Sequence, residues 1–268
     1  MTALNSPNMN LMIRAAEKAA KSLIRDFGEV ENLQVSVKGP GDFVSAADKR
    51  SEQIIFEELK KAKPGYSFLM EESGEVAGED KDHVWIIDPL DGTTNFLHGL
   101  PHWCISIALM DKGEITHGLI YDPVKDDLFT AERGNGAFHR RRRLRVSGRR
   151  DMSFSAIATG APLRTIPKSG AKFIKEYDAV QSMGASMRRF GAAALDLAYV
   201  ASGKFDAFWE RDLKPWDIAA GMLLVKESGG FYSDIDDKKN DVLRTGNIVA
   251  GNEPLFETLR ATLQKAGK

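Results

Sequence analysis

The chain has very little cysteine and no long apolar run. Its single cysteine, Cys104, excludes an internal disulfide and a thiolate zinc cluster. No stretch approaches the roughly 20 consecutive apolar residues of a membrane-spanning helix, and the first residues lack the basic flank and apolar run of a secretory signal. We therefore expect a cytoplasmic protein.

The chain also lacks an excess of charge of either sign. Lys and Arg total 37 against 38 Asp and Glu, a formal net charge of -1, so the whole molecule does not attract nucleic acid. With 43% hydrophobic and 28% charged residues, it has the composition of an ordinary soluble globular protein. The 5 histidines form no HExxH pair, which disfavours a zinc hydrolase. Any ligand must be recognised by a local group of residues.

The hydrophobic pattern predicts a layered α/β fold, with helix and sheet layers alternating. The N-terminal half, about residues 1–150, begins with helices over 9–27 and 45–63, and continues with short strands and an antiparallel meander over 114–148. In the C-terminal half, about 151–268, strands and helices alternate. No Pro/Ser-rich linker separates the halves, so we expect one catalytic unit with its active site between them.

Carboxylates follow the ends of several predicted elements. Glu71 and Glu72 follow "YSFLM", Asp88 and Asp91 follow "VWII", and Asp217 stands where "KPWD" opens a helix. Taken singly, such residues are more often solvated surface, turn or helix-cap residues. Strand ends and helix starts are, however, where open α/β sheets build their sites. Converging carboxylates would repel one another without a cation, and hard oxygen ligands favour Mg²⁺ or Mn²⁺ over zinc.

The segment Gly92-Thr93-Thr94 adds an anion cradle to these acids. Glycine lets backbone N–H groups approach an anion closely, and threonine hydroxyls donate hydrogen bonds. An EF-hand calcium loop is disfavoured, because Leu90 stands where that loop needs an oxygen ligand. Two divalent ions would neutralise the four charges of Glu71, Asp88, Asp91 and Asp217, and a phosphate dianion would leave room for a third ion. Paired metal ions commonly serve phosphate ester hydrolysis, so these residues predict a metal-dependent phosphatase.

Four segments, in order, resemble the inositol monophosphatase family. They are "KGPGDFVSAAD" (38–48), "FLMEES" (68–73), "WIIDPLDGTTNF" (85–96) and "KPWDIAAGMLLVKESGG" (214–230). The resemblance covers nearly the whole chain. It implies the sandwich fold shared by inositol monophosphatases and fructose-1,6-bisphosphatases, and Mg²⁺-dependent release of myo-inositol and phosphate from inositol 1- or 4-phosphate.

The resemblance also implies a set of metal ligands. Glu71, Asp88, the backbone carbonyl of Leu90 and Asp91 are expected to hold the activating Mg²⁺. Asp88, Asp91 and Asp217 are expected to hold a second ion, and Mn²⁺ is a conceivable substitute. In the family a third, weak metal ion can bind, and Li⁺ can inhibit by occupying the second site.

Catalytic roles follow from the same resemblance. Glu71 and Thr93 are expected to orient and deprotonate the attacking water, and Asp48 is expected to lie beside the water network. The backbone amides of Gly92 and Thr93 are expected to bind the phosphate. Taken alone, Asp48 has the character of a solvated helix residue, so its motif is what singles it out.

Substrate contacts are expected from Ala193 and Glu210, because a carboxylate can accept hydrogen bonds from polyol hydroxyls. Ala192 stands where relatives commonly carry Ser or Thr, which weakens the case for strict inositol specificity, and Met70 occupies an often small position, which affects packing only. Fructose 1,6-bisphosphate, histidinol phosphate and nucleotide 3'-phosphates are the alternative substrates in the family. Relatives are commonly homodimers.

Residues 139–150, "HRRRRLRVSGRR", contain seven arginines that the phosphatase hypothesis does not use. The simpler interpretation is an exposed hairpin whose charges protect a sheet edge from pairing. The alternative is an RNA- or transcription-associated binding surface over Arg140–Arg150, since clustered arginines neutralise phosphates. The run lacks interleaved aromatic residues that would stack on bases. Trp103, Phe208 and Trp209 are expected in the core or at a subunit interface.

Overall fold

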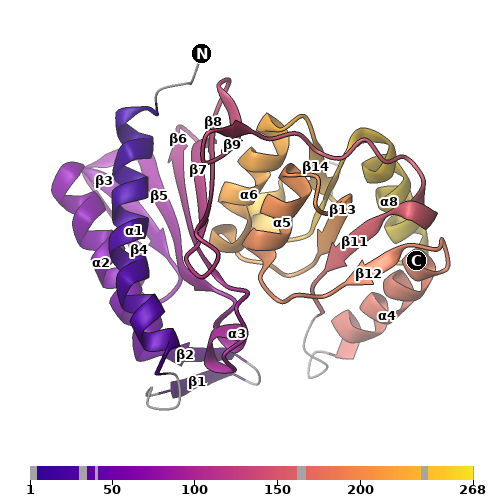
Figure 1. The fold of residues 1–268 in the computed structure, drawn as a ribbon, viewed down its shortest axis with the longest axis horizontal. Helices are drawn as coiled ribbons and strands as arrows, with labels where there is room; N and C mark the ends of the chain where they lie inside the picture. Colours follow the sequence, from indigo (N-terminus) through magenta and orange to yellow (C-terminus); the bar gives the residue numbers. More distant parts are fainter. Residues whose placement is uncertain (1–4, 30–34, 40–41, 162–166, 237–240, 268) are drawn as a thin grey trace.

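The computed structural model describes residues 5–29, 35–39, 42–161, 167–236 and 241–267, which fold into alternating helix and sheet layers (Figure 1). The outer layers contain α1 (Pro7–Phe27) with α2 (Ala46–Ala62) on one side, and α4 (Pro167–Gln181) with α8 (Glu253–Ala266) on the other. Between the two sheets lie α5 (Ala193–Ala201) and α6 (Pro215–Glu227). The predicted layered α/β fold is confirmed.

The larger sheet has eight strands in the order β10-β9-β8-β7-β6-β5-β3-β4. Its strands are β3 (Tyr66–Met70), β4 (Gly74–Val76), β5 (Asp80–Asp91), β6 (Cys104–Asp111), β7 (Glu114–Asp122), β8 (Asp127–Glu132), β9 (Gly136–His139) and β10 (Arg142–Arg143). Only β3 and β5 pair in parallel; the other neighbours are antiparallel. The parallel pair brings the carboxyl ends of β3 and β5 to the same edge.

The smaller sheet has five strands in the order β12-β11-β13-β15-β14. Its strands are β11 (Ala156–Thr159), β12 (Ser186–Arg188), β13 (Ala207–Glu210), β14 (Phe231–Asp234) and β15 (Ile248–Gly251). The alternation of strand and helix predicted for the C-terminal half is confirmed. The pattern missed several short elements: β1 (Val35–Gly39), β2 (Asp42–Ser45), α3 (Thr93–Leu97), η2 (Met152–Phe154) and α7 (Val242–Thr245), together with β4.

Helix α1 follows from local sequence signals. Ser6 caps it, since its hydroxyl accepts a hydrogen bond from the Met9 amide at 3.1 Å, and Pro7 occupies the first turn, where no amide is needed. The alanines on its inner face are buried, which allows close packing of α1 on its neighbour α2.

Helix α6 lies enclosed between the two sheets, near the expected site. Every residue from Ile218 to Val225 is buried, because α6 contacts the larger sheet and also β14 of the smaller one. A helix that is apolar all round is suited to such a central position. The first turn of α6 carries Asp217, so the packing of this helix fixes where that carboxylate lies. The division into two halves with an active site between them stays a prediction.

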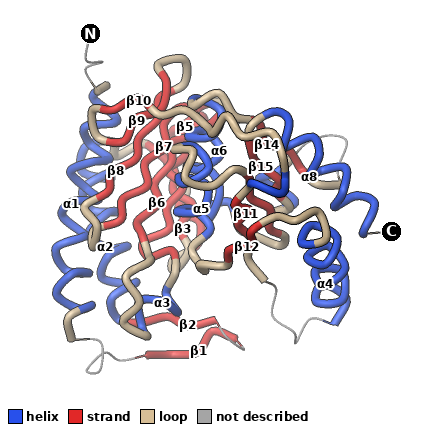
Figure 2. Tube along the Cα trace, turned by 45° about the vertical axis from the view of Figure 1, so that its right-hand side comes forward, coloured by secondary structure: helices blue, strands red, loops and turns tan. Residues whose placement is uncertain are grey.

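The arginine-rich segment splits into two parts. Residues 139–143 form the β9–β10 turn and the edge strand, as the hairpin interpretation predicted, and Arg140 forms an ion pair with Asp126. Residues 144–151, here called the strap, begin beside β9, where the Leu144 amide donates to the Ala137 carbonyl oxygen, and then cross to the smaller sheet (Figure 2). The hairpin prediction is therefore wrong for the strap. The strap leaves the larger sheet because its Arg149 pairs with Asp206, a fully buried carboxylate beside the smaller sheet.

Large aromatic side chains lie in the core. Trp103, Phe208 and Trp209 are all fully buried, which confirms the expected core positions. None of the described helices is long and apolar enough to cross a membrane.

Candidate active site

The end of β5 places two carboxylates at the edge of the larger sheet. The apolar residues Trp85, Ile86 and Ile87 are buried in the strand, and the pairing with β6 is then interrupted between Asp88 and Asp91. A β-bulge of this kind bends a strand and re-aims its side chains. The Leu90 amide donates to Asp88 Oδ1 at 2.9 Å, which holds the bend.

Four of the predicted site acids influence one another electrostatically. Burial raises the pKa of Asp88 well above its usual value, and the charges of Glu71, Asp91 and Asp217 raise it further. Glu71 follows β3, which runs parallel to β5, and Asp217 lies in the first turn of α6. The fold thus brings together carboxylates that lie far apart in sequence, and we call these four residues the acid cluster.

Asp91 is held by two neighbouring elements. The Ala194 amide, in the first turn of α5, donates to Asp91 Oδ2 at 2.8 Å, and the Cys104 thiol donates to the same oxygen at 3.7 Å. Burial is the largest influence on Asp91 and, with Glu71 nearby, raises its pKa to about 7, against the opposing effect of these donors. Ala194 and Cys104 were not predicted. Only the pairing of Asp91 with Cys104 across β5 and β6 reveals the second contact.

Asp217 differs from the simpler interpretation of an N-cap residue, while its expected role as a metal ligand stays a prediction. It does not cap α6 from outside the helix; it is the third helical residue, and its Oδ2 accepts a hydrogen bond from the Lys214 amide at 2.7 Å. The Asp217 amide in turn donates to the Lys214 carbonyl oxygen at 3.1 Å, and the two bonds together fix the carboxylate at the start of the helix.

The predicted anion cradle lies directly after the bulge. Gly92 has a φ of 91°, a left-handed conformation that favours glycine, and a Cβ there would lie 3.0 Å from the His102 carbonyl oxygen. The Thr93 hydroxyl lies 3.0 Å from Asp48 Oδ1 and 3.0 Å from the Leu90 carbonyl oxygen. Asp48, in the first turn of α2, is fully buried, so the solvated interpretation of this residue is wrong.

The two predicted substrate residues belong to different elements. Ala193 is the first residue of α5, and Glu210 ends β13. Burial raises the pKa of Glu210 to about 8, with Asp217 and Asp91 adding to the shift. Ala192 is the N-cap residue of α5. Because it has no hydroxyl, no side chain caps the start of this helix.

The acid cluster has the chemistry of a hard-cation site. Its donors are carboxylates, with the Leu90 carbonyl beside them, and such oxygens suit Mg²⁺ or Mn²⁺. Among the described residues, no three or more His, Cys, Asp and Glu side chains are already spaced to hold a metal ion. Negative charges that lie together in a buried site repel one another. A bound divalent cation would relieve this repulsion.

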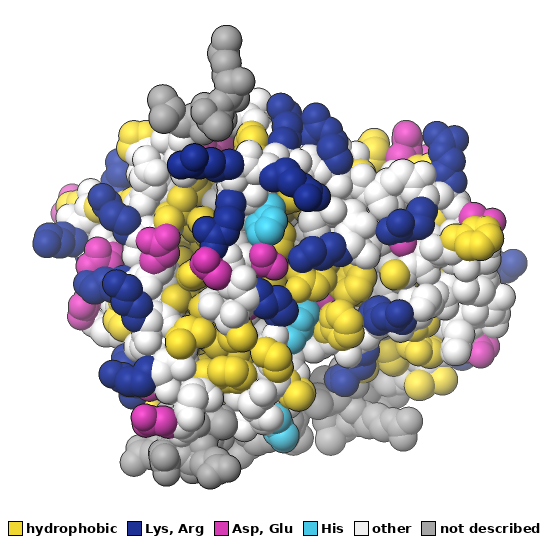
Figure 3. Space-filling model, viewed as in Figure 1, with side chains coloured by type: hydrophobic (Ala, Val, Ile, Leu, Met, Phe, Trp, Pro, Cys, Tyr) yellow, Lys and Arg dark blue, Asp and Glu magenta, His cyan; other side chains and the backbone are white. Residues whose placement is uncertain are grey.

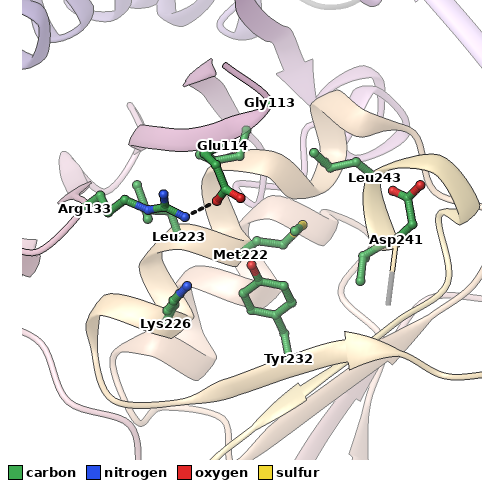
Figure 4. Close-up of a pocket in the computed structure, with 11 residues that line it drawn as sticks. Gly113, Glu114, Arg133, Met222, Leu223, Lys226, Tyr232, Asp241 and Leu243 are labelled. Carbon is green, nitrogen blue, oxygen red and sulfur yellow. Dashed lines mark hydrogen bonds and ion pairs between the residues drawn. The ribbon is translucent and has the colours of Figure 1, made fainter. Parts of the chain in front are cut away.

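A separate cavity of about 200 Å³ lies toward the other end of α6 (Figure 4). Met222 and Lys226 of α6 line it together with Tyr232 of β14, and an ion pair between Glu114 and Arg133 stands at its side. None of the predicted site residues lines this cavity.

Comparison with known proteins agrees with this geometry. The sequence profile of the inositol monophosphatase family matches residues 5–268. The chain belongs to the inositol monophosphatase family. It is therefore a phosphoric monoester hydrolase, and the enzymes of this family generally depend on metal ions.

Individual relatives fall under two names. The chain is 55% identical to an inositol-1-monophosphatase of Mesorhizobium japonicum over 96% of both chains. It is 43% identical to the Nus factor SuhB of Escherichia coli, again over 96% of both chains. The crystal structure of the extragenic suppressor protein suhB from Bartonella henselae superposes with a TM-score of 0.93 at 55% identity, covering 97% of this chain and 99% of that one.

Proposed function

We propose that the protein hydrolyses inositol 1- or 4-phosphate in a Mg²⁺-dependent reaction, releasing myo-inositol and phosphate. The observation that best supports this is the acid cluster, in which Glu71, Asp91 and Asp217 all act on Asp88. The choice of substrate is supported by family membership and by the similarity of the chain to the inositol-1-monophosphatase of Mesorhizobium japonicum.

The acid cluster and the Leu90 carbonyl are the proposed ligands of two Mg²⁺ ions, with Asp48 able to assist a third. Glu71, Asp88, Leu90 and Asp91 would hold one ion, while Asp88, Asp91 and Asp217 would hold the other. Bound Mg²⁺ supplies charge neutralisation for the phosphate and a lower pKa for water. Li⁺ inhibition stays an expectation of the family resemblance.

The remaining residues would position water and substrate. Glu71 would take the proton of the attacking water, and Thr93 would orient that water through the hydroxyl that already lies beside Asp48. The amides of Gly92 and Thr93 would bind phosphate oxygens, because glycine lets backbone N–H groups approach an anion closely. This arrangement needs neither a histidine base nor a phosphorylated enzyme.

Polyol recognition would fall to Ala193 and Glu210. The carboxylate of Glu210 can accept hydrogen bonds from ring hydroxyls, and Ala193 lets the ring lie against the start of α5. Ala192 provides no hydroxyl, so we expect some tolerance for fructose 1,6-bisphosphate, histidinol phosphate or nucleotide 3'-phosphates.

The test is phosphate release from a panel of esters, each with Mg²⁺ and with EDTA. The panel contains inositol 1-phosphate, 2-glycerophosphate, fructose 1,6-bisphosphate, histidinol phosphate and adenosine 3',5'-bisphosphate. Mg²⁺-dependent preference for inositol 1-phosphate supports the proposal. A different preferred ester would replace the substrate, and hydrolysis that persists in EDTA would overturn the role of the acid cluster.

A homodimer is the proposed assembly, and the cytoplasm the proposed compartment. Three exposed apolar side chains, Leu100 at 52%, Phe190 at 41% and Val124 at 36% exposure, support an interface. Asn95 joins the segments that carry the first two, since its amide donates to the Phe190 carbonyl at 2.8 Å. Figure 3 shows hydrophobic side chains gathered in the lower middle of the molecule, in the region of α3. Light scattering on the purified protein measures the state directly.

A second candidate function is binding of RNA or a transcription complex by Arg140–Arg150. The relative named Nus factor SuhB favours it, as do the exposed side chains of Arg141, Arg142 and Arg150. Phosphate contacts by arginine weaken as salt rises. Salt-sensitive RNA retention that disappears when Arg140–Arg143 are replaced by alanine would support this function, and salt-insensitive or absent retention would dismiss it.

A further inference from the structure

We infer that Gly160 is a specificity-determining residue, which provides the space that seats the Glu210 carboxylate for polyol recognition. The inference rests on the proposed function, because it assumes that Glu210 contacts the substrate. Gly160 directly follows β11, and Glu210 ends β13. The two strands pair in parallel with Thr159 opposite Trp209, so Gly160 and Glu210 are the next residues in that register.

The carboxylate of Glu210 occupies the place where a side chain at residue 160 would begin. A Cβ on Gly160 would lie 1.7 Å from Glu210 Oε1, 2.0 Å from Cδ and 2.3 Å from Oε2. All three distances are far below the closest approach of non-bonded atoms. Any side chain at this position is therefore incompatible with the observed place of Glu210.

The backbone itself does not require glycine at this position. Gly160 is not among the residues with positive φ, whereas Gly92 and Gly191 are. An L-residue could adopt its conformation without strain. The need for glycine thus comes from the neighbouring carboxylate.

Two neighbours of Glu210 favour a carboxylate at this position, although burial and two other carboxylates oppose its charge. The Gly160 amide hydrogen-bonds the carboxylate, and Arg189 attracts it, while Asp91 and Asp217 repel it. A Glu210 side chain displaced from Gly160 would lose the amide donor. We therefore expect displacement to weaken contacts with substrate hydroxyls.

Gly160 differs from the structurally required glycines in what a methyl group would meet. At Gly118 the closest atom is the Ala220 carbonyl oxygen at 2.8 Å, and at Gly246 it is the Leu213 carbonyl oxygen at 2.0 Å. Alanine at those positions would displace backbone. At Gly160 the nearest atoms all belong to the end of a flexible side chain, so the fold can accommodate Gly160→Ala by moving Glu210.

The first experiment is a double-mutant cycle of Gly160→Ala and Glu210→Ala in the Mg²⁺-loaded enzyme. The readout is the ratio of kcat/KM for inositol 1-phosphate to kcat/KM for p-nitrophenyl phosphate, which has no polyol hydroxyls. We expect Gly160→Ala to lower this ratio about tenfold through a higher KM for the inositol ester. The same change made in the Glu210→Ala background should have almost no effect. Gly148→Ala is the matched control, because a Cβ there meets nothing within 4 Å.

The outcomes separate this inference from the proposed function. If Glu210→Ala lowers the ratio and Gly160→Ala does not, the inferred role of Gly160 is wrong, and the proposed contact between Glu210 and the substrate is retained. If Gly160→Ala lowers the ratio equally in both backgrounds, its effect is structural and the inference fails. If Glu210→Ala leaves the ratio unchanged, the proposed substrate contact is wrong, and the inference is overturned with it.

Crystal structures of the wild-type protein and Gly160→Ala test the geometry without any assay of activity. We expect the Glu210 carboxylate to shift by more than about 1 Å while the backbone of β11 and β13 stays in place. An unmoved carboxylate, or a backbone that moves instead, would contradict the inference even if the enzyme acts on a different ester.

Discussion

At the scale of single residues, Asp91 is constrained both by hydrogen bonds and by a neighbouring charge. One of its oxygens accepts hydrogen bonds from the Ala194 amide and the Cys104 thiol, and Glu71 adds a repelling charge. A carboxylate so placed is costly to keep charged without a cation nearby. The buried negative charge of Asp91 is thus both what would attract a metal ion in the proposed function and what lowers the stability of the metal-free protein.

Replacing Asp91 by asparagine should separate these two effects. We expect Asp91→Asn to lower kcat/KM about 100-fold or more, because the shape is kept while the metal-binding charge is lost. The metal-free variant should unfold at a temperature no lower than the wild type. Phosphate release and thermal unfolding in EDTA measure the two properties. Asp82→Asn, at an exposed carboxylate, is the control, and full activity with unchanged Mg²⁺ dependence in Asp91→Asn would reject the site.

At the scale of elements, the strap depends on one buried carboxylate. Asp206 binds Arg149 Nε at 2.7 Å and the Ala156 amide at 2.7 Å, and it also accepts from the Ser147 hydroxyl. Asn252 adds hydrogen bonds to the Ser147 and Arg149 carbonyls. These contacts fasten the strap to the start of β11, so an arginine in this segment contributes to the fold.

Removing the charge of Asp206 should therefore cost stability. We expect Asp206→Asn to lower the free energy of unfolding by about 2 kcal/mol, since Arg149 keeps part of its hydration. Asp126→Asn, which breaks an exposed pair with Arg140, should cost less than about 0.5 kcal/mol. Urea unfolding of both variants compares them, and equal losses would contradict a special role for Asp206.

The same scale explains how far sequence could predict this protein. Long elements such as α1 and β5 carry strong periodic patterns, and the acids of the site stand in motifs at strand ends. Short elements such as β4 and α7 depend on turn contacts that no period marks. The Cys104 contact and the seat at Gly160 arise from strand pairing, which places residues together that are distant in sequence.

At the scale of the whole molecule, buried carboxylates tie stability to pH and to metal. The pKa values of Asp91 and Glu210 are raised to about 7 and about 8 in the folded protein, from usual values near 3.8 and 4.5. Between the usual and the folded pKa values the native state binds more protons than the unfolded state, so stability falls as pH rises through that interval. His102, whose pKa burial lowers to about 4, has the opposite effect, but only below its usual value of 6.5.

The metal-free protein should consequently lose stability between about pH 6.5 and 8. We expect its unfolding temperature to fall by about 5 °C over this range, and saturating Mg²⁺ to raise it and reduce the slope. Thermal unfolding in EDTA and in Mg²⁺ across the range measures both. If the unfolding temperature of the metal-free protein rises or stays level over this range, the pKa values of Asp91 and Glu210 are not raised in the folded protein.

The central place of α6 also bears on how the protein is made. Apolar residues of the larger sheet, including Ile120 and Phe129, share one core cluster with α5 and α6, which come much later in the chain. During synthesis, this face of the larger sheet stays uncovered until residues 193–227 have left the ribosome. The nascent chain thus exposes an apolar sheet face from the time Phe129 is made until residues 193–227 follow, which makes that face a target for chaperones during synthesis.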